Sequence, residues 1–270
     1  MTRLSAVVIA KNAAVKLGAC LDSVRLADEI LVYDGGSSDA TVEIARARGA
    51  RVVTDTDWQG YGVQRQRAQA EARGEWIFMV DADERVTPEL AAEIRAALDA
   101  DDPATAYAVP RRTWAFGRYL SHGGWWPDYV VRLYQRDRGH YNDALVHERV
   151  ELAPSTRLAR FKSPLLHHTY RNLHEYLVKS AGYADSWAQA NARDGDSASL
   201  ASGIVHAIAC FIRMYLLNLG FLDGQPGLLL ALLSSHSTFV KYADLWLRAH
   251  DPGPPEAEGR EQGKEKSSDS

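Results

Sequence analysis

Short apolar runs alternate with helical repeats along the first 100 residues of the chain. Continuous apolar runs predict strands buried on both faces at residues 6–10, 30–33, 52–53 and 76–80. Between these runs apolar residues recur at helical spacing, and the segment 87–98 opens on Thr-Pro-Glu, a typical helix start. Strand–helix alternation with short connections predicts an α/β fold whose central, mainly parallel sheet is covered by helices on both faces.

The pattern changes in the second half of the chain. Residues 105–170 are rich in Trp, Tyr, Arg and His, and residues 171–195 have helical spacing. Two segments without a formal charge, 197–212 and 224–240, fall short of the roughly 20 apolar residues of a spanning helix. We therefore expect two helices that lie on a membrane surface or re-enter it. Spanning helices, core helices and dimer-interface helices are the alternatives.

These changes divide the chain into three parts. Residues 1–170 are expected to form the α/β domain, and residues 171–250 a helical region with amphipathic or membrane-surface helices. Residues 251–270 contain three prolines, three glycines and no large apolar side chain. Such a segment cannot bury enough apolar surface to fold, so it is predicted to be a disordered tail.

Composition narrows the class of protein. With 31 basic and 35 acidic residues the net charge is −4, which argues against a nucleic-acid binder. Two distant cysteines, Cys20 and Cys210, provide neither a disulfide framework nor a zinc site. The apolar run at residues 6–10 ends at Lys11 and is too short for a signal peptide, so we expect the protein to stay inside the cell.

Acidic residues stand directly after two predicted strands. Asp81-Ala82-Asp83-Glu84 follows the run 76–80, at the sheet edge where α/β folds bind ligands. Asp81 and Asp83 could hold one Mg²⁺ or Mn²⁺ together with a diphosphate. The alternative is a pair of helix caps or solvated turn residues.

A glycine-containing turn follows the second predicted strand. It reads Asp34-Gly-Gly-Ser-Ser-Asp39, so the backbone could approach a ligand, and Asp34 could accept hydrogen bonds from a base or ribose. The alternative is an ordinary strand–helix turn capped by Asp39. Because the first strand is followed by Lys11-Asn12-Ala-Ala rather than G-x-G-x-x-G, a dinucleotide-binding dehydrogenase is disfavoured.

Together with Val8-Ile-Ala-Lys-Asn12, these acidic segments resemble glycosyltransferase family 2, which has the Rossmann-like GT-A nucleotide-sugar-binding fold. Four further segments resemble its bacterial branch that adds sugars to the lipopolysaccharide inner core, usually a β-1,4-glucosyltransferase acting on heptose: residues 58–62, 122–128, 142–148 and 220–224. The resemblance covers about residues 3–248. Ala13 stands where the family commonly has Glu, and the Gln-x-x-Arg-Trp motif of processive synthases is absent, which favours transfer of a single sugar.

The resemblance implies an inverting, metal-dependent hexosyltransferase and assigns roles to residues. The nucleotide-sugar, expected to be a UDP-sugar, would contact Lys11, Asn12, Asp34, Arg65, Asp81, Ala82 and Asp83, of which Asp81 and Asp83 would bind Mg²⁺ or Mn²⁺. A further metal ligand could come from His147, His167 or His168. The general base that deprotonates the acceptor hydroxyl would be Glu148, with Asp143 and Asp128 as alternatives.

The resemblance also implies partners and a location. The acceptor, a lipid A–core glycan, would contact Trp125, Trp126 and Arg132. We expect the enzyme to be peripheral or monotopic on the cytoplasmic face of the bacterial inner membrane, where basic side chains beside the apolar helices would meet anionic headgroups. The alternatives are a glycosyltransferase acting on another lipid-linked or envelope polysaccharide, and a non-catalytic nucleotide-sugar-binding membrane scaffold.

Overall fold

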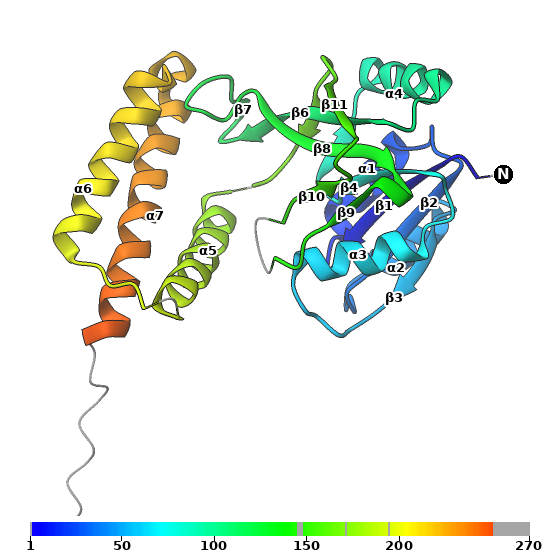
Figure 1. Cartoon of the computed structure of the whole chain (residues 1–270). Helices are drawn as coiled ribbons and strands as arrows, with labels where there is room; N and C mark the ends of the chain where they lie inside the picture. The colour runs from blue at the N-terminus through cyan, green and yellow to red at the C-terminus, as the bar shows by residue number, and fades with distance from the viewer. Residues whose placement is uncertain (1, 145–147, 171, 194, 251–270) are drawn as a thin grey trace, which may run out of the picture.

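The computed structural model describes residues 2–144, 148–170, 172–193 and 195–250 (Figure 1). An α/β part built around one large sheet lies beside a group of long helices, α5, α6 and α7, formed by the C-terminal third of the chain (Figure 1). The tail predicted to be disordered, residues 251–270, lies outside the described residues.

The central sheet has the strand order β3-β2-β1-β4-β8-β6-β12-β5. Four parallel strands form its first half: β1 (Leu4–Ala10), β2 (Glu29–Asp34), β3 (Arg51–Thr54) and β4 (Trp76–Asp81). The second half is mixed, because β8 (Asp128–Gln135) runs antiparallel to both β4 and β6 (Thr105–Ala115). Beyond β6 lie β12 (Leu165–His167), parallel to it, and β5 (Glu84–Val86), antiparallel to β12.

Shorter strands complete the α/β part. β7 (Arg118–Tyr119) and β11 (Arg157–Arg160) pair with β6, whereas β9 (Gly139–Tyr141) and β10 (Val150–Leu152) form a separate two-stranded sheet that follows the 3-10 turn η1 (Arg136–Arg138). The sheet is therefore mixed and mostly parallel. The predicted parallel arrangement is confirmed for the four N-terminal strands, and the antiparallel β8 is an addition to the prediction.

Helices cover both faces of the sheet because the strands are apolar on both sides. Ala6 and Val8 of β1 pack in one core with α1 (Ala14–Ser23), α2 (Thr41–Ala47) and α4 (Pro88–Ala100). Val7 faces the opposite core, which contains α3 (Tyr61–Glu71). The alternating side chains of a strand explain this division. The predicted start of α4 is confirmed, since the Thr87 hydroxyl accepts a hydrogen bond from the Leu90 N–H at 3.2 Å.

Asn12 precedes α1 without capping it. The N-cap position of α1 is Ala13, and Asn12 has a φ of 51°. Its Oδ1 accepts a hydrogen bond from the Ser38 N–H at 2.9 Å, and its own N–H donates to the Ser37 hydroxyl at 2.8 Å. Asn12 thus joins the loops after β1 and β2, which form one wall of the edge where the acidic residues lie.

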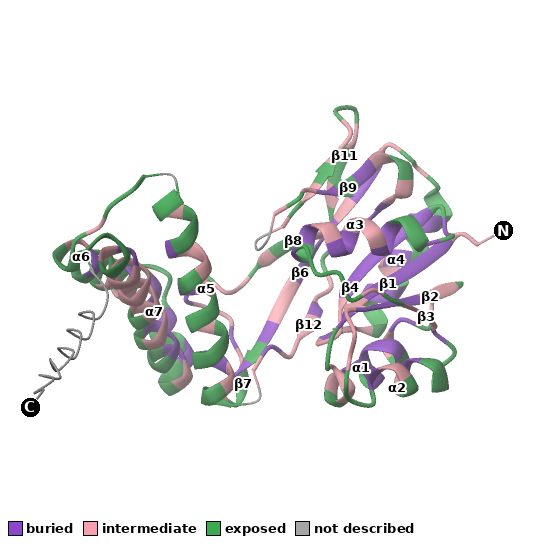
Figure 2. Cartoon of the chain, turned by 90° about the horizontal axis from the view of Figure 1, so that it is seen from below, coloured by how far each residue is buried: buried purple, intermediate pink, exposed green. Residues whose placement is uncertain are grey.

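The C-terminal third is helical. It comprises α5 (Leu173–Arg193), α6 (Leu200–Phe211), the π-helical turn η2 (Ile212–Leu217), the 3-10 turn η3 (Gly220–Asp223) and α7 (Gly224–His250). Helices are therefore confirmed over both charge-free segments. The stretch Leu200–Leu217 is long and apolar enough to cross a membrane by length and composition, with a mean hydropathy of 1.8, yet only 17% of it is buried. Figure 2 shows exposed residues along much of α6, so α6 is not a core helix.

Candidate functional site

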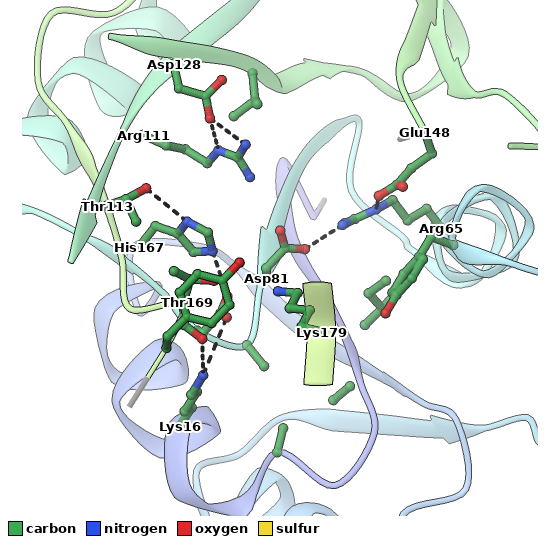
Figure 3. A pocket seen from close by; sticks show the side chains of 18 of the residues that line it. Lys16, Arg65, Asp81, Arg111, Thr113, Asp128, Glu148, His167, Thr169 and Lys179 are labelled. Atoms are coloured by element: carbon green, nitrogen blue, oxygen red, sulfur yellow. Dashed lines mark hydrogen bonds and ion pairs between the residues drawn. The ribbon is translucent and has the colours of Figure 1, made fainter. Parts of the chain in front are cut away.

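A cavity of about 1330 Å³ lies at the carboxyl ends of β1 and β4 (Figure 3). Its walls come from the loop after β1, the Asp81–Asp83 turn, α3, β8 and β12, and α5 closes the side opposite the sheet. Ligands of open α/β sheets bind at this edge, because the loops that follow parallel strands gather there. Its size and its mixture of carboxylates, cations and aromatic rings suit a polar ligand as large as a nucleotide-sugar.

Asp81, at the end of β4, is held by two arginines. Arg65 Nη2 donates to Asp81 Oδ1 at 2.5 Å (Figure 3), and Arg132 Nη2 donates to Asp81 Oδ2 at 2.6 Å. Burial by itself would raise the pKa of Asp81, but the charges of Arg132 and Arg65 hold it well below its usual value. Asp81 is therefore a permanent carboxylate whose two oxygens already accept charged hydrogen bonds.

Arg132 also bonds to Glu84, the last residue of the acidic segment, for which the sequence predicted no separate role. Glu84 is fully buried, and its Oε1 accepts a hydrogen bond from Arg132 Nη2 at 2.6 Å. Its Oε2 accepts the Asp81 N–H at 2.9 Å, which fixes the turn. Burial raises the pKa of Glu84 to about 7 against the opposing charge of Arg132. Arg132, predicted to bind the acceptor, lines the cavity with only 4% of its surface exposed and bridges two carboxylates.

Arg132→Met is expected to lower the free energy of unfolding by about 3–5 kcal/mol, because it leaves two buried carboxylates without their shared cation. Urea unfolding of the two proteins measures the difference. Arg157→Met is the matched control. Arg157 is an exposed arginine on β11 that forms an ion pair with Asp102, and losing it should lower the free energy of unfolding far less. Equal losses in both variants would show that the Arg132 bridge contributes nothing special.

Asp83 is the carboxylate of this turn that faces other polar groups of the cavity. Its Oδ1 lies 3.6 Å from His167 Nε2, and its Oδ2 lies 3.7 Å from Lys16 Nζ. Burial lowers the pKa of His167 to about 4 in spite of the neighbouring Asp83, so the imidazole is neutral near pH 7. A neutral imidazole nitrogen beside a carboxylate oxygen provides two ligands that suit a divalent cation.

The fit of a metal ion therefore rests on Asp83 and His167. Two ligands bound at about 2.1 Å to one cation are roughly 3–4 Å apart, which matches the 3.6 Å between Asp83 Oδ1 and His167 Nε2. Over the described part of the chain, no group of three or more His, Cys, Asp or Glu residues is close enough to hold a metal. Substrate oxygens and water would have to complete the shell. His168 bonds instead to Tyr119 at 3.1 Å, and His147 lies outside the described residues.

Glu148 reaches the cavity from the segment before β10. Its Oε1 accepts a hydrogen bond from Arg65 Nε at 2.8 Å, so Arg65 links Glu148 to Asp81 (Figure 3). The approach depends on Gly62 of α3, because a Cβ there would lie 1.9 Å from the Asn142 carbonyl oxygen. The glycine thus lets the backbone of residues 142–144 touch α3.

The two alternative bases lie in different settings. Asp128, at the start of β8, lines the cavity and accepts hydrogen bonds from Arg111 Nε at 2.9 Å and Nη2 at 2.5 Å. Asp143 is exposed, accepts a hydrogen bond from Gln66 Nε2 at 2.7 Å, and is not among the described residues that line the cavity. Of the three predicted bases, Glu148 and Asp128 therefore line the cavity, where an acceptor could reach them.

Asp34 is buried inside its own turn. Its oxygens accept hydrogen bonds from the N–H groups of Gly36 and Ser37, both at 3.1 Å, and from the Ser37 hydroxyl at 2.5 Å. Asp34 thus shapes the glycine-containing turn, while Lys11 is exposed and lines the cavity. Any contact of Asp34 with a nucleoside would add to these hydrogen bonds.

A smaller pocket of about 320 Å³ adjoins the main cavity beside Lys11 and Gly35. The rings of Trp58 and Tyr61, on its rim, meet edge to face with centroids 4.9 Å apart. Gln64 lines the same pocket, and its buried Oε1 has no hydrogen-bond partner among the described residues. A flat aromatic surface with a spare acceptor suits a nucleobase that presents an N–H.

The expected acceptor wall is divided. Trp125 lines the main cavity and packs against the helical region. Trp126 is not among the described residues that line the cavity. The Arg112 guanidinium lies over the Trp126 ring, with Cζ 6.0 Å from the ring centroid. The lining residues that sequence reasoning missed include Lys16, Lys179 and Tyr183. Lys179 and Tyr183 belong to α5, and only the packing of that helix opposite the sheet places them there.

Comparisons with known proteins give a consistent result. The model of the family "Glycosyl transferase family 2" matches residues 5–160, more than half of the chain. The lipopolysaccharide core biosynthesis glycosyltransferase LpsC of Rhizobium meliloti is 28% identical over 89% of this chain and 93% of its own length. An uncharacterized glycosyltransferase of Rickettsia bellii is 24% identical over 90% of this chain and 86% of its own. The S. aureus TarS structure in complex with UDP-GlcNAc covers 90% of this chain and 89% of its own, with 15% identity and a TM-score of 0.46.

Proposed function

The chain belongs to glycosyltransferase family 2, and from this premise we propose that it transfers a single hexose from a nucleotide-sugar to a lipopolysaccharide inner-core acceptor with inversion. The observation that carries the proposal is the cavity at the strand ends, which Asp83, His167 and Glu148 all line. The distant relationship to LpsC, a lipopolysaccharide core biosynthesis glycosyltransferase, supports the class of acceptor.

The donor would extend from the smaller pocket into the main cavity. In this pose the base, uracil in our proposal, lies between Trp58 and Gln64, and the diphosphate lies near Lys11, Lys16 and the start of α1. A Mg²⁺ or Mn²⁺ held by Asp83 and His167 would offset the negative charge that develops on the leaving diphosphate. The cationic Lys16, which lies 3.7 Å from Asp83 in the described structure, would remain beside the same phosphates.

Asp81 has a supporting role in this proposal. Because both of its oxygens are bonded to arginines, it holds Arg65 and Arg132 in place and leaves Asp83 as the principal metal-facing carboxylate. It could add a contact to a metal or ribose through the remaining lone pairs of its oxygens.

Glu148 is the proposed general base. An acceptor hydroxyl is a poor nucleophile unless its proton leaves as it attacks, and a carboxylate within hydrogen-bond reach can take that proton. Arg65 fixes the Glu148 carboxylate through Oε1, and no described residue donates to Oε2. The proton of the hydroxyl would move to Oε2 while the oxygen attacks the anomeric carbon from the face opposite the diphosphate, which inverts its configuration.

A chromosomal deletion tests the biological reaction. Cells that lack the gene are expected to make lipid-linked core oligosaccharide that is shorter by one hexose and everything attached to it, as measured by mass spectrometry. The purified enzyme with UDP-glucose and other UDP-hexoses should restore that mass on the truncated core. An unaltered core, with a mass change in another envelope glycan, would transfer the proposal to that glycan. Donor binding without turnover on any of these acceptors would favour a non-catalytic scaffold.

A further inference from the structure

Exposed apolar side chains lie along α6, on the turn that joins it to α7, and on the first turns of α7. At least 36% of each of these side chains is exposed, whereas large exposed apolar residues are scattered elsewhere in the described chain. We define the hairpin surface by these residues: Leu200, Ile204, Val205, Ile208, Ile212, Leu216, Leu217, Leu219, Phe221, Leu222, Leu228, Leu229 and Leu232. Large exposed apolar patches are uncommon on monomeric soluble proteins, so this concentration of exposed apolar residues in one helical hairpin points to a contact with a partner or a membrane.

The charges around the hairpin surface favour an anionic partner. Between residues 197 and 243 the formal charges are Arg213, Asp223 and Lys241. Asp223 is 1% exposed, whereas Arg213 is exposed next to Ile212. The surface therefore combines a wide apolar area with positive charge and presents no exposed carboxylate within that segment.

Asp223 connects this surface to the catalytic cavity. Its Oδ2 accepts hydrogen bonds from the N–H groups of Ser121 at 2.9 Å and His122 at 2.8 Å. The next residue, Gly123, donates its N–H to the Asn218 carbonyl oxygen at 2.8 Å. The same loop carries Trp125, which lines the cavity. These bonds place the acceptor side of the cavity directly beside the turn of the hairpin.

We propose that the hairpin surface binds the interfacial layer of an anionic lipid bilayer, with α6 lying along the membrane and Arg213 among the headgroups. Amphipathic helices with an apolar face and basic flanks bind membranes in this way. A lipid-linked acceptor in the same leaflet would then reach the cavity beside Trp125. This last step rests on the proposed function; the binding of lipid does not.

The packing favours a surface position over a spanning one. One side of α6 packs along α7, which carries Lys241, Asp244 and Arg248 towards its C-terminal end. The turn between the two helices is hydrogen-bonded to the loop after β7. α5, which carries Lys179 and Asp185, also packs along α7, and Arg248 of α7 donates a hydrogen bond to Asp185 at 2.6 Å. If α6 and α7 crossed a bilayer together, the charged side chains of α5 would be drawn into hydrocarbon, which is unfavourable. A one-sided contact buries the hairpin surface without that cost.

Flotation of the purified full chain with lipid vesicles tests the inference. We expect binding to vesicles of phosphatidylethanolamine and phosphatidylglycerol, and much weaker binding to phosphatidylcholine alone. Combining Ile204→Glu with Ile208→Glu should weaken binding at least about tenfold, since both changes place a charge where apolar contact is lost. Arg213→Ser should weaken binding to the anionic vesicles about fivefold.

Leu158→Glu is the matched control, because Leu158 is an equally exposed leucine (52%) on β11, outside the hairpin surface. It should bind vesicles as the wild type does. All variants should keep the wild-type rate of UDP-sugar hydrolysis without acceptor, which shows that the donor site is folded. Failure of the wild type to float, or unchanged flotation of the double variant, would overturn the inference. So would a wild-type dimer in sedimentation that the double variant dissociates, because the surface would then bind a second copy.

The proposed function and this inference can fail separately. Vesicle binding that depends on Ile204 and Ile208, in a protein whose deletion leaves the lipopolysaccharide core intact, would retain the membrane surface and reject the acceptor. Normal transfer of sugar to the core by a protein that does not bind vesicles would retain the proposed acceptor and reject the membrane surface.

Discussion

Glu148→Gln is expected to lower kcat for sugar transfer by about 10²–10⁴-fold with little change in donor affinity. Glutamine keeps an oxygen that can accept the hydrogen bond from Arg65 Nε, so Arg65 and Asp81 should stay in place. What the variant loses is the ability to take a proton from the acceptor hydroxyl. Steady-state transfer kinetics give kcat, and isothermal titration calorimetry with the UDP-sugar gives donor affinity.

The other two carboxylates provide the comparison. Asp143→Asn should transfer sugar at the wild-type rate, because Asp143 is exposed and bonded to Gln66 outside the cavity lining. Asp128→Asn should have a moderate effect through the loss of the Arg111 ion pair. Wild-type rates in Glu148→Gln together with a collapse in Asp128→Asn would assign the base to Asp128.

The first half of the fold and its ligand edge follow directly from the sequence. Apolar runs that end in Asp34 and Asp81 predict parallel strands, and the carboxyl ends of parallel strands must share one edge. That rule places Asp81 and Asp83 at the cavity without any tertiary information. It does not say which way each carboxylate faces, and the structure gives them different settings: Asp81 between two arginines and Asp83 opposite His167.

The remaining site residues depend on long-range packing that local patterns do not encode. His167 reaches Asp83 only because β12 pairs with β5, with His167 opposite Glu84 in the ladder. Arg132 meets Glu84 and Asp81 because β8 inserts antiparallel beside β4. A three-residue strand such as β12 has too few residues to show a period, so its partner could not be predicted.

The helical region shows the same division. The absence of charge at 197–212 and 224–240 predicts helices, but it does not say which face of α6 stays open. The open face is decided by the packing of α6 along α7 and by the hydrogen bonds of Asp223 with the loop after β7. The single acidic residue of this apolar segment, Asp223, is a sequence signal that could have indicated the docking, because a carboxylate among apolar residues needs hydrogen-bond partners.

Asp83→Asn is expected to remove the stimulation of transfer by Mn²⁺ or Mg²⁺ and to lower kcat at least about 100-fold, while the fold stays intact. The change keeps the size of the side chain but replaces a charged ligand oxygen with an amide, which binds hard cations weakly. Mn²⁺ binding in the presence of UDP, followed by electron paramagnetic resonance, should weaken in parallel. His167→Asn should weaken Mn²⁺ binding in the same assay, because His167 Nε2 lies 3.6 Å from Asp83 Oδ1 and the two atoms would bind the same ion.

Asp22→Asn is the control for this pair, because Asp22 lies at an exposed position of α1, where its partners are Arg25 and Arg48. It should leave metal binding and kcat unchanged. If Asp83→Asn still responds to Mn²⁺ as the wild type does, the metal cannot depend on Asp83. If metal binding persists in Asp83→Asn but disappears in Asp81→Asn, the metal is assigned to Asp81. In that case the metal would bind the lone pairs of Asp81 that Arg65 and Arg132 do not use. Asp81→Asn also weakens the bonds of Asp81 to Arg65 and Arg132, so among these aspartate variants it alone should lower the free energy of unfolding in urea. Urea unfolding therefore separates a metal ligand from a residue that holds the site together.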